Sequence, residues 1–535
     1  MFTSFKKTMS LFLVLVMAVS LLAGCASGEK TTETNVPESD TSTNAPATNG
    51  GSDAAEGITF PLAEPVEFTC MAGMNGEYAI SSNPAMVKAM EDANIKINFI
   101  DVLGADLAEK QNLVIGSGEY PDFFYKTWCD GYKYGQQGIM IPLEDLIREY
   151  APNLTKLLDE RDGWQYITAA DGHVYGFPEI DAPTPANLIY WINKDWMANL
   201  GLKEPTNFDE LYEVLKAFKE QDANGNGDPN DEIPFLCDTY CNPMMLMQYV
   251  DFPYSALEKV GVKDGKLFYV PTSEEFKEFL GYIAKLYQEG LIYEYTYTTD
   301  HDQIPALAQS GDIAGSFFDA GAFLTVGRGN DKAYMGLTPW ADCLPIGSGI
   351  NANTMCITDK CENPEILVAW MDRFYSQEGG VLAWMGVEGV SWQYNDEGDW
   401  EWILGNGYGD DVSTVRASAA LQGAQTHPSV QPDIWMTGMS SSVDPEEVYL
   451  NSERVRMAEH GVVPLPAMSY TEEQYAEIAT IKTDTDGYFD QYVAQVVTGE
   501  ISLEDSWDEF VATMNNMGAL RLTELYQAIY DNATK

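Results

Sequence analysis

Strand-like and helix-like patterns alternate along the first part of the chain. Residues 66–71, 95–100 and 122–125 are short runs rich in apolar and aromatic side chains, and they predict strands. Residues 84–92, between the first two runs, have a helical pattern. A fourth run, 188–192, is almost wholly apolar and predicts a buried strand. This alternation favours a layered α/β architecture.

Helix-start signals are clearest in the middle of the chain. Asn207 is a good N-cap with Glu210 three residues later, and Thr272 and Glu275 repeat this spacing. The helix after Asn207 carries an apolar stripe formed by Phe208, Leu211, Tyr212, Leu215 and Phe218. Three further helical patterns end the chain, over residues 471–497, 505–517 and 518–530. They predict a helical C-terminal region.

The first 25 residues have the order of a bacterial lipoprotein leader. Lys6 and Lys7 precede the apolar residues 9–22, which are too few to span a bilayer comfortably. The sequence Leu-Ala-Gly-Cys at 22–25 is similar to a lipobox, in which signal peptidase cuts before the cysteine and its thiol receives diacylglycerol. We therefore predict a lipoprotein signal peptide over 1–24 and lipidation of Cys25. An ordinary signal peptide with a chance cysteine is the alternative.

The next stretch has the composition of a tether. After Cys25, residues up to 57 are mostly Ser, Thr, Asn, Gly, Pro, Ala and acidic residues, which cannot bury enough apolar surface to fold. A flexible coil of this length reaches roughly 30 Å. We predict a lipidated cysteine and disordered tether over 25–57, which places the protein on the extracellular face of the cell membrane.

The charge of the chain restricts its partners. The formal net charge is −52 over 535 residues, and a nucleic-acid partner would need a basic surface instead. The body after residue 57 is long enough for more than one lobe. The seven cysteines beyond Cys25 are odd in number and irregularly spaced, which argues against a disulfide framework. None of the four histidines forms the His-x-x-x-His pair of zinc proteases.

Residues 222–232 form the densest group of possible metal ligands. Oxygen-bearing side chains occupy every second position from 222 to 230, and Gly225 and Gly227 allow a tight turn. The register matches an EF-hand loop over nine positions, but Glu232 comes one position early and Pro234 disfavours an immediate exit helix. We predict a structural Ca²⁺ site, not a paired EF-hand sensor, with these ligands: Asp222, Asn224, Asn226, Asp228, Asp231 and Glu232. A solvated Asn/Gly turn is the alternative.

Several short sequences carry a family resemblance. They are Tyr-Pro-Asp-Phe-Phe at 120–124, Ile-Pro-Leu-Glu-Asp-Leu-Ile at 141–147, Asp-Gly-His-Val-Tyr-Gly-Phe-Pro at 171–178, Trp-Ile-Asn-Lys-Asp-Trp at 191–196 and Gly-Val-Glu-Gly-Val-Ser-Trp at 386–392. In this order, the chain over about 60–530 resembles the family 1 extracellular solute-binding proteins of ABC importers. The similarity is greatest to the large lipoprotein-A-like and alginate-binding-protein-like subgroup.

The resemblance implies a two-lobed periplasmic-binding-protein-like fold of type II, with a ligand cleft between two α/β lobes. It implies chain crossings near 188–193, 334–353 and 376–380. The expected division is 58–190 plus 340–375 for lobe 1, and 191–339 plus 376–535 for lobe 2, which would carry the calcium loop 222–232. In alginate-binding relatives the matching loop holds calcium. An extra residue within 228–231 leaves open whether Asp231 or Glu232 is the bidentate ligand.

Aromatic and planar polar side chains in expected cleft loops are the candidate ligand contacts, because sugars are bound by flat aromatic faces and hydrogen-bonding groups. These candidates are Asn75, Glu77, Tyr78, Trp128, Phe318, Asp319, Trp340, Glu388, Trp392 and Trp435. Trp128, for example, follows a predicted strand, where ligand loops of open α/β sheets arise. For Asp319 and Glu388 a capping or interlobe hydrogen bond is an equal alternative.

These residues lead to one main function and two alternatives. The main prediction is a non-enzymatic, monomeric binding lipoprotein that captures an oligosaccharide by hinge closure and delivers it to ABC permease subunits. The first alternative keeps the fold but binds a peptide or another small nutrient. The second is an extracellular glycoside hydrolase, for which Asp319 and Glu388 would be the two carboxylates.

Overall fold

The structure is a computed structural model that describes residues 57–183, 188–423 and 426–534. The predicted signal peptide, Cys25 and all of the predicted tether except residue 57 lie outside these residues. Within the described part of the chain, no helix has the length and apolarity needed to cross a membrane.

A five-stranded sheet organises the first lobe. Its order is β2 (Ile95–Val102), β1 (Val66–Gly73), β3 (Phe123–Tyr125), β12 (Ile350–Ile357) and β4 (Phe177–Ile180). The first three strands are parallel, whereas β12 runs antiparallel to both β3 and β4. The predicted strands at 66–71, 95–100 and 122–125 are thereby confirmed.

Helices cover both faces of this sheet because successive strand residues point to opposite faces. Phe123 and Tyr125 belong to one core, whereas Phe124 between them belongs to the other. The helices around the sheet are α1 (Pro84–Glu91), α2 (Gly104–Ser117), α3 (Gly131–Gln136), α4 (Glu144–Tyr150), α5 (Pro152–Glu160), α6 (Trp164–Ile167) and α12 (Pro364–Asp372).

The segment after α12 also packs on the first lobe. It contains α13 (Gln377–Met385), β13 (Trp392–Tyr394), β14 (Trp400–Trp402), α14 (Val412–Ala419) and α15 (Asp433–Thr437). Its tryptophans Trp384, Trp400 and Trp435 share a core with Phe68 and Tyr125. The prediction that all of 376–535 belongs to the second lobe is therefore wrong for 376–443, because these large apolar side chains pack on the core of the first sheet.

The second lobe is built on a smaller sheet in the order β10 (Tyr334–Gly336), β5 (Ile189–Asn193), β9 (Ser316–Asp319). Strand β5 is buried on both faces: Ile189 and Trp191 enter one core, and Tyr190 and Ile192 enter another. This confirms the predicted buried strand at 188–192. The segment after the calcium-loop candidate continues the sheet, because Leu236 pairs in parallel with Phe317 of β9.

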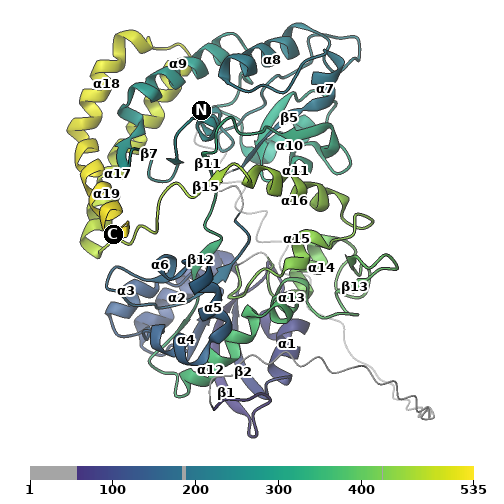
Figure 1. The fold of residues 1–535 in the computed structure, drawn as a ribbon, viewed down its shortest axis with the longest axis vertical. Helices are drawn as coiled ribbons and strands as arrows, with labels where there is room; N and C mark the ends of the chain where they lie inside the picture. Colours follow the sequence, from purple (N-terminus) through teal and green to yellow (C-terminus); the bar gives the residue numbers. More distant parts are fainter. Residues whose placement is uncertain (1–56, 184–187, 424–425, 535) are drawn as a thin grey trace, which may run out of the picture. The chain divides into compact units, whose positions relative to one another are not determined.

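Helices form most of the rest of the second lobe. They are α7 (Lys194–Asn199), α8 (Phe208–Glu220), α9 (Glu274–Gln288), α10 (Ile304–Ala308), α11 (Ala322–Val326), α16 (Pro445–Ala458), α17 (Glu472–Val497), α18 (Leu503–Met517) and α19 (Ala519–Ala533). A small sheet of β6 (Tyr254–Ser255), β7 (Val260–Lys263) and β8 (Lys266–Tyr269) lies among them. Figure 1 shows α17 and α18 beside α9, so the predicted C-terminal helices form and share the core of this lobe.

The crossings between the lobes follow from this packing. The chain returns to the first lobe between β10 and β12, as predicted, and β11 (Leu344–Pro345) on the way pairs with β15 (Gly461–Val462). It leaves the first lobe again before α16, whose Leu450 and Met457 enter a second-lobe core. The predicted crossing at 376–380 is therefore wrong by more than sixty residues, since Val443 still packs with the first lobe.

The helix that leads to the calcium-loop candidate begins as predicted. The side chain of Asn207 accepts a hydrogen bond from the backbone N–H of Glu210 at 2.9 Å. The N-cap of α9 differs from the prediction, because the hydroxyl of Ser273, not that of Thr272, accepts from the backbone of Phe276. Ser273 is the last residue with extended backbone before the helix, which is the defining conformation of an N-cap.

Candidate ligand-binding site

A cavity of about 310 Å³ is lined by residues of both lobes. The first lobe contributes Asp181, Trp384, Arg416, Gln422, Gln431 and Trp435, among others. The second lobe contributes Phe323, Leu324, Glu447, Asn451 and Arg454, among others. Strand β4 ends just before Asp181, and Ala320 of the lining follows the last residue of β9. The cavity thus lies beside the ends of one strand from each sheet, where open α/β sheets bind ligands.

Helix α16 presents one face to this cavity. Glu447, Leu450, Asn451 and Arg454 are spaced by three and four residues, so they lie on the same side of the helix. Arg454 and Glu447 form an ion pair at 3.6 Å, and Leu450 also packs into the second-lobe core. The helix therefore holds polar groups at the cavity on a rigid apolar support.

Two tryptophans of the first lobe, Trp384 and Trp435, also line the cavity. The rings of Trp384 and Trp435 meet at a centroid distance of 5.2 Å, and Trp400 stacks on Trp435 at 5.4 Å. The guanidinium of Arg416 lies over Trp435 at 4.9 Å and donates to Gln422 Oε1 at 2.6 Å. These contacts fix the aromatic rings and the cation relative to one another.

Two carboxyl groups lie at the end of β4. Glu179 accepts from Asn351 Nδ2 at 3.3 Å and from the backbone of His427 at 3.3 Å. Burial raises the pKa of Glu179, and burial together with the charge of Glu179 raises the pKa of Asp181. Burial lowers the pKa of Lys126 to about 7, although the attraction of Glu179 opposes this shift. The end of the sheet is therefore a low-dielectric region with few solvated charges.

Several buried polar atoms around the cavity have no hydrogen-bond partner among the described residues. They are Asp181 Oδ1, Trp384 Nε1, Arg416 Nε and both side-chain polar atoms of Asn451. All four side chains line the cavity, and the set includes donors and acceptors. Buried polar atoms are usually paired, because an unpaired one costs about 1–3 kcal/mol.

Residues 79–381 match the family model of bacterial extracellular solute-binding proteins, which covers more than half of the chain. This chain belongs to that family of solute-binding proteins. The predicted resemblance is confirmed, and so is the non-enzymatic class, because the family and its close relatives bind solutes and are not enzymes.

Two curated relatives extend the comparison of this solute-binding protein. The fructooligosaccharide ABC transporter substrate-binding protein FusA of Streptococcus pneumoniae is 28% identical over 513 residues, which cover 89% of this chain and 92% of FusA. Lipoprotein LipO of Bacillus subtilis is 29% identical over 291 residues, which cover 52% of this chain and 50% of LipO.

Solved structures show the same fold. An EF-hand mutant of Streptococcus pneumoniae FusA, in complex with fructo-nystose, has a TM-score of 0.67 at 24% identity, covering 88% of this chain and 99% of that one. An HMO-binding solute-binding protein from Bifidobacterium longum infantis has a TM-score of 0.74 at 20% identity, covering 88% of this chain and 100% of that one. The predicted two-lobed α/β binding-protein fold is thus confirmed.

The predicted ligand residues of this solute-binding protein are dispersed. Trp435 lines the cavity, and Asp319 directly precedes Ala320, which also lines it. Asp319 itself is buried and accepts hydrogen bonds from Ala320 N–H and from Thr325 Oγ1. Glu388 is exposed in the turn between α13 and β13, and no contact joins it to Asp319 among the described residues. Asp319 is thus engaged by hydrogen bonds within the second lobe, whereas Glu388 lies at the surface of the first lobe.

Two of the predicted aromatic residues, Phe318 and Trp392, are buried in the core, and Trp340 is partly buried against it. Phe318 packs on Tyr190 at 4.9 Å, and Trp340 packs edge-on against Phe208 at 4.7 Å. Trp392 is 3% exposed, and its Nε1 donates to the carbonyl of Gly386. None of the three lines the cavity.

The predicted ligand residues in the loops at the end of the first sheet differ in how exposed they are. Asn75 is fully buried, where its side chain donates to Ala420 O and accepts from Lys126 Nζ at 2.6 Å. Its backbone pairs with that of Tyr78, and Glu77 between them is exposed. Trp128 is 50% exposed at a positive φ of 49°, a strained conformation for a bulky residue. A contact from Trp128, Glu77 or Tyr78 to ligand stays a prediction.

Sequence reasoning missed most of the cavity. Arg416, Gln422, Gln431, Asn451 and Trp384 were not predicted, although all of them line it. Helix α16 is rich in charged and polar residues over its whole length, so the spacing of Glu447, Asn451 and Arg454 is only a weak signal. No comparable signal marks Asp181 or Gln431, because they lie in irregular segments.

The predicted calcium loop, residues 222–232, makes a tight turn. Gly225 and Gly227 have φ values of 73° and 95°, which only glycine adopts at low cost. Asn224 Oδ1 accepts from the backbone of Asn226, and Asn226 Oδ1 accepts from the backbone of Asp228, so side chains of the loop hold its own turns. No three carboxyl groups of the described loop have oxygens within 4.8 Å of one another in this structure.

Two buried oxygens of this loop test the fit further. Asp222 Oδ1 and Glu232 Oε2 have no partner among the described residues. Asp231 is engaged by the amide groups of Asn224 and Asn226 at 3.2 and 2.7 Å, so it too lies among the predicted ligands. Burial raises the pKa of Glu232 in the absence of a cation. The two buried oxygens are the observation that supports a divalent ion at this loop.

Proposed function

We propose that this protein is the binding subunit of an ABC importer and captures an uncharged oligosaccharide between its lobes. The observation that carries the proposal is the lining of the cavity, which combines two tryptophans with buried polar atoms that have no partner among the described residues. Oligosaccharides present apolar C–H faces and many hydroxyl groups, and this lining offers a complement to both. FusA, which is named for fructooligosaccharides, supports this class of ligand.

The charges of the lining favour an uncharged sugar. The lining contains two acidic residues, Asp181 and Glu447, and two basic residues, Arg416 and Arg454. Arg454 already forms an ion pair with Glu447. A raised pKa makes Asp181 easier to protonate, and a protonated carboxyl group can donate to a hydroxyl oxygen. A polyanionic sugar would need an excess of cations that this lining does not offer.

Hinge closure follows from the division of the lining between lobes. The two tryptophans come from the first lobe, and the polar face of α16 comes from the second. A ligand that contacts both lobes binds the closed arrangement better than an open one and shifts the population toward it. The closed form would then be the one that the permease subunits recognise.

A structural calcium ion and a lipid anchor complete the proposal. Asp222, Asn224, Asn226, Asp228, Asp231 and Glu232 would hold Ca²⁺ and tie the end of α8 to the strand-like segment that follows the loop. The EF-hand named for FusA supports this assignment. Cys25 would carry diacylglycerol on the extracellular face of the cell membrane, which the relative LipO, named as a lipoprotein, supports.

A ligand screen tests the proposal directly. Purified protein is mixed with neutral and acidic oligosaccharides and with peptides, and binding is measured by thermal shift and calorimetry. A neutral oligosaccharide at about 100 times its Kd should stabilise the fold by about 2.7 kcal/mol, and Asn451→Ala should weaken its binding. Binding of peptides alone, or of uronate oligomers in preference to neutral sugars, would contradict the proposal.

A further inference from the structure

A cluster of polar side chains lies beside the cavity at the edge of the second-lobe sheet. Leu236 pairs in parallel with Phe317. Two residues further along each of these two segments, Asp238 therefore comes next to Asp319. The charges of Asp238 and His301 both act on the pKa of Asp319. Ala320, which follows Asp319, lines the cavity. The cluster and the cavity therefore occupy the same edge of the sheet.

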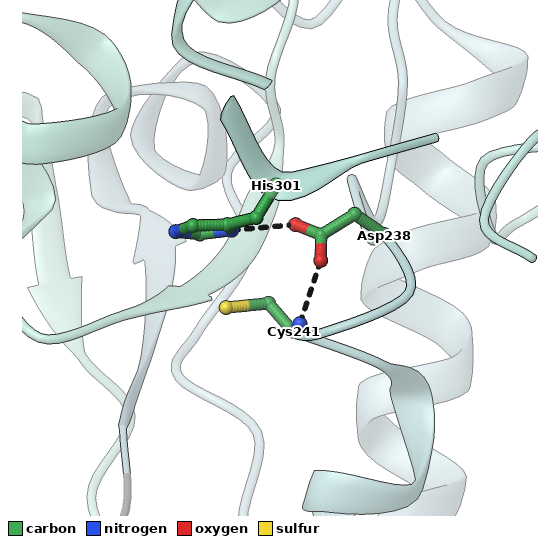
Figure 2. Close-up of side chains that lie close together, drawn as sticks. All are labelled: Asp238, Cys241 and His301. Carbon is green, nitrogen blue, oxygen red and sulfur yellow. Dashed lines mark hydrogen bonds and ion pairs between the residues drawn. The ribbon is translucent and has the colours of Figure 1, made fainter. Parts of the chain in front are cut away.

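Asp238 fixes the orientation of His301. Its Oδ1 accepts hydrogen bonds from the backbone N–H groups of Tyr240 and Cys241, both at 2.7 Å. Its Oδ2 lies 2.9 Å from Nδ1 of His301, as Figure 2 shows. Because an ionised carboxylate can only accept, Nδ1 carries the proton and Nε2 of a neutral His301 remains an acceptor. Asp238 is 1% exposed, so this arrangement is rigid.

Tyr240 adds an aromatic face to the cluster. Its side chain is 59% exposed, which is unusual for a large aromatic residue. Its ring meets the imidazole of His301 edge to face at a centroid distance of 5.3 Å. Together the two residues present an aromatic surface and an oriented hydrogen-bonding nitrogen, which are the two elements that bind a sugar ring.

The same cluster contains possible metal ligands, but its bonding disfavours a metal site. Ligand atoms of Asp238, Cys241 and His301 lie within 4.8 Å of one another. Both oxygens of Asp238 are already engaged, and a metal at Nδ1 of His301 would break its bond to that carboxylate. Burial and the charge of Asp238 raise the pKa of the Cys241 thiol, whereas a metal ligand must be a thiolate.

We propose that Tyr240 and His301 form a second sugar subsite, which holds a distal unit of an oligosaccharide whose other units fill the cavity. The proposal rests on the proposed function and deepens it, because it makes chain length a determinant of affinity. A ligand confined to the cavity would not reach Tyr240, whereas a longer one would stack on it. Asp238 acts as a positioning residue that keeps His301 in the hydrogen-bonding tautomer.

Chain-length dependence of binding tests the subsite. Calorimetry would compare kestose with the longer fructo-nystose for the wild type, Tyr240→Ala and Tyr240→Phe. We expect Tyr240→Ala to weaken fructo-nystose binding about tenfold, equivalent to about 1.4 kcal/mol, and kestose binding by less than about twofold on the same scale. Tyr240→Phe should keep most of the affinity, because it retains the ring. Tyr394→Ala is the matched control, since Tyr394 is also exposed, at 51%, and lies in β13 of the first lobe.

The outcomes separate the subsite from the proposed function. Equal losses for the two sugars, or no loss for either, would overturn the subsite while leaving oligosaccharide binding intact. Absence of binding of both sugars to the wild type would remove the subsite together with this class of ligand. Titration with Zn²⁺ covers the metal alternative: binding in the wild type that Cys241→Ser abolishes would reassign the cluster as a metal site.

Discussion

The guanidinium of Arg416 lies over the ring of Trp435, 4.9 Å from its centroid, while one of its nitrogens donates to Gln422. Its Nε is buried without a partner among the described residues, and the side chain lines the cavity. The two contacts therefore fix the orientation of the guanidinium beside the cavity. This relationship makes Arg416 the first residue to test.

Substitution of Arg416 by lysine should weaken ligand binding about tenfold, because lysine keeps the charge but loses the planar stacking and the forked donors. The change corresponds to about 1.4 kcal/mol and is measured by calorimetry with the sugar found in the screen. Arg521→Ala is the control, because Arg521 pairs with Glu477 on exposed parts of α19 and α17. Unchanged affinity for Arg416→Lys would show that the stacked guanidinium does not contribute to binding.

Asn451 should show opposite effects on stability and affinity. It is 3% exposed, and both of its polar side-chain atoms are unpartnered among the described residues. Asn451→Leu removes these atoms at similar volume, so the ligand-free protein should gain about 1 kcal/mol in the free energy of unfolding. Ligand affinity should fall at least about tenfold.

Urea unfolding without ligand and calorimetry with ligand measure the two effects of Asn451→Leu. The neighbouring Leu450→Ala is a contrasting variant, because it removes core packing and should cost about 2–5 kcal/mol. A loss of stability in Asn451→Leu with full affinity would mean that Asn451 is a structural residue of α16.

Chelation should separate the calcium loop from ligand binding. EDTA should lower the melting temperature, because the buried oxygens of Asp222 and Glu232 would lose their cation. Affinity should change little at temperatures where the protein stays folded, since no residue of the loop lines the cavity. Asp222→Ala should remove the effect of EDTA on the melting temperature. Asp508→Ala, at an exposed position of α18, should leave that effect unchanged. A large loss of affinity without unfolding would place the metal in the ligand site.

Asp372 should make the first lobe less stable as the pH rises. Its carboxyl group accepts from the backbone of Leu154 and Asn153 at the start of α5, yet burial raises its pKa from 3.8 to about 6. Because the raised pKa means that the folded state holds the proton of Asp372 more tightly than the unfolded state, protonation stabilises the fold below pH 4. This contribution to the free energy of unfolding is lost as the pH rises through about 6.

Chemical unfolding across this range, for the wild type and Asp372→Asn, measures the contribution of Asp372. About two pKa units correspond to at most about 3 kcal/mol. The asparagine variant should lose this part of the pH dependence. Identical pH profiles for the two proteins would show that Asp372 titrates normally.

The lipid anchor is a prediction that depends only on the sequence. Cys25→Ser should move the protein from the membrane fraction to the medium in a bacterial host and abolish incorporation of labelled fatty acid. The matched control is Cys361→Ser, which changes a cysteine in the folded body of the protein. Membrane association that persists in Cys25→Ser would contradict lipidation at this site.

The sequence by itself determined the local features and the family. The strand patterns at β1, β2 and β5, the N-cap at Asn207 and the glycine-rich turn of the 222–232 loop depend on neighbouring residues, so they can be predicted from short segments. The ordered short sequences along the chain indicated the binding-protein fold. The class of ligand followed only in outline, from the abundance of aromatic residues.

Tertiary structure alone decided which residues surround the cavity. Trp435 and Trp392 are both nearly buried tryptophans of the first lobe, but only Trp435 lines the cavity. Asn451 and Trp384 line the same cavity from different lobes because the chain leaves the first lobe after Val443 and not at 376. The physical reason is that lobe membership depends on which apolar surface a segment covers, and that surface is assembled from strands hundreds of residues apart.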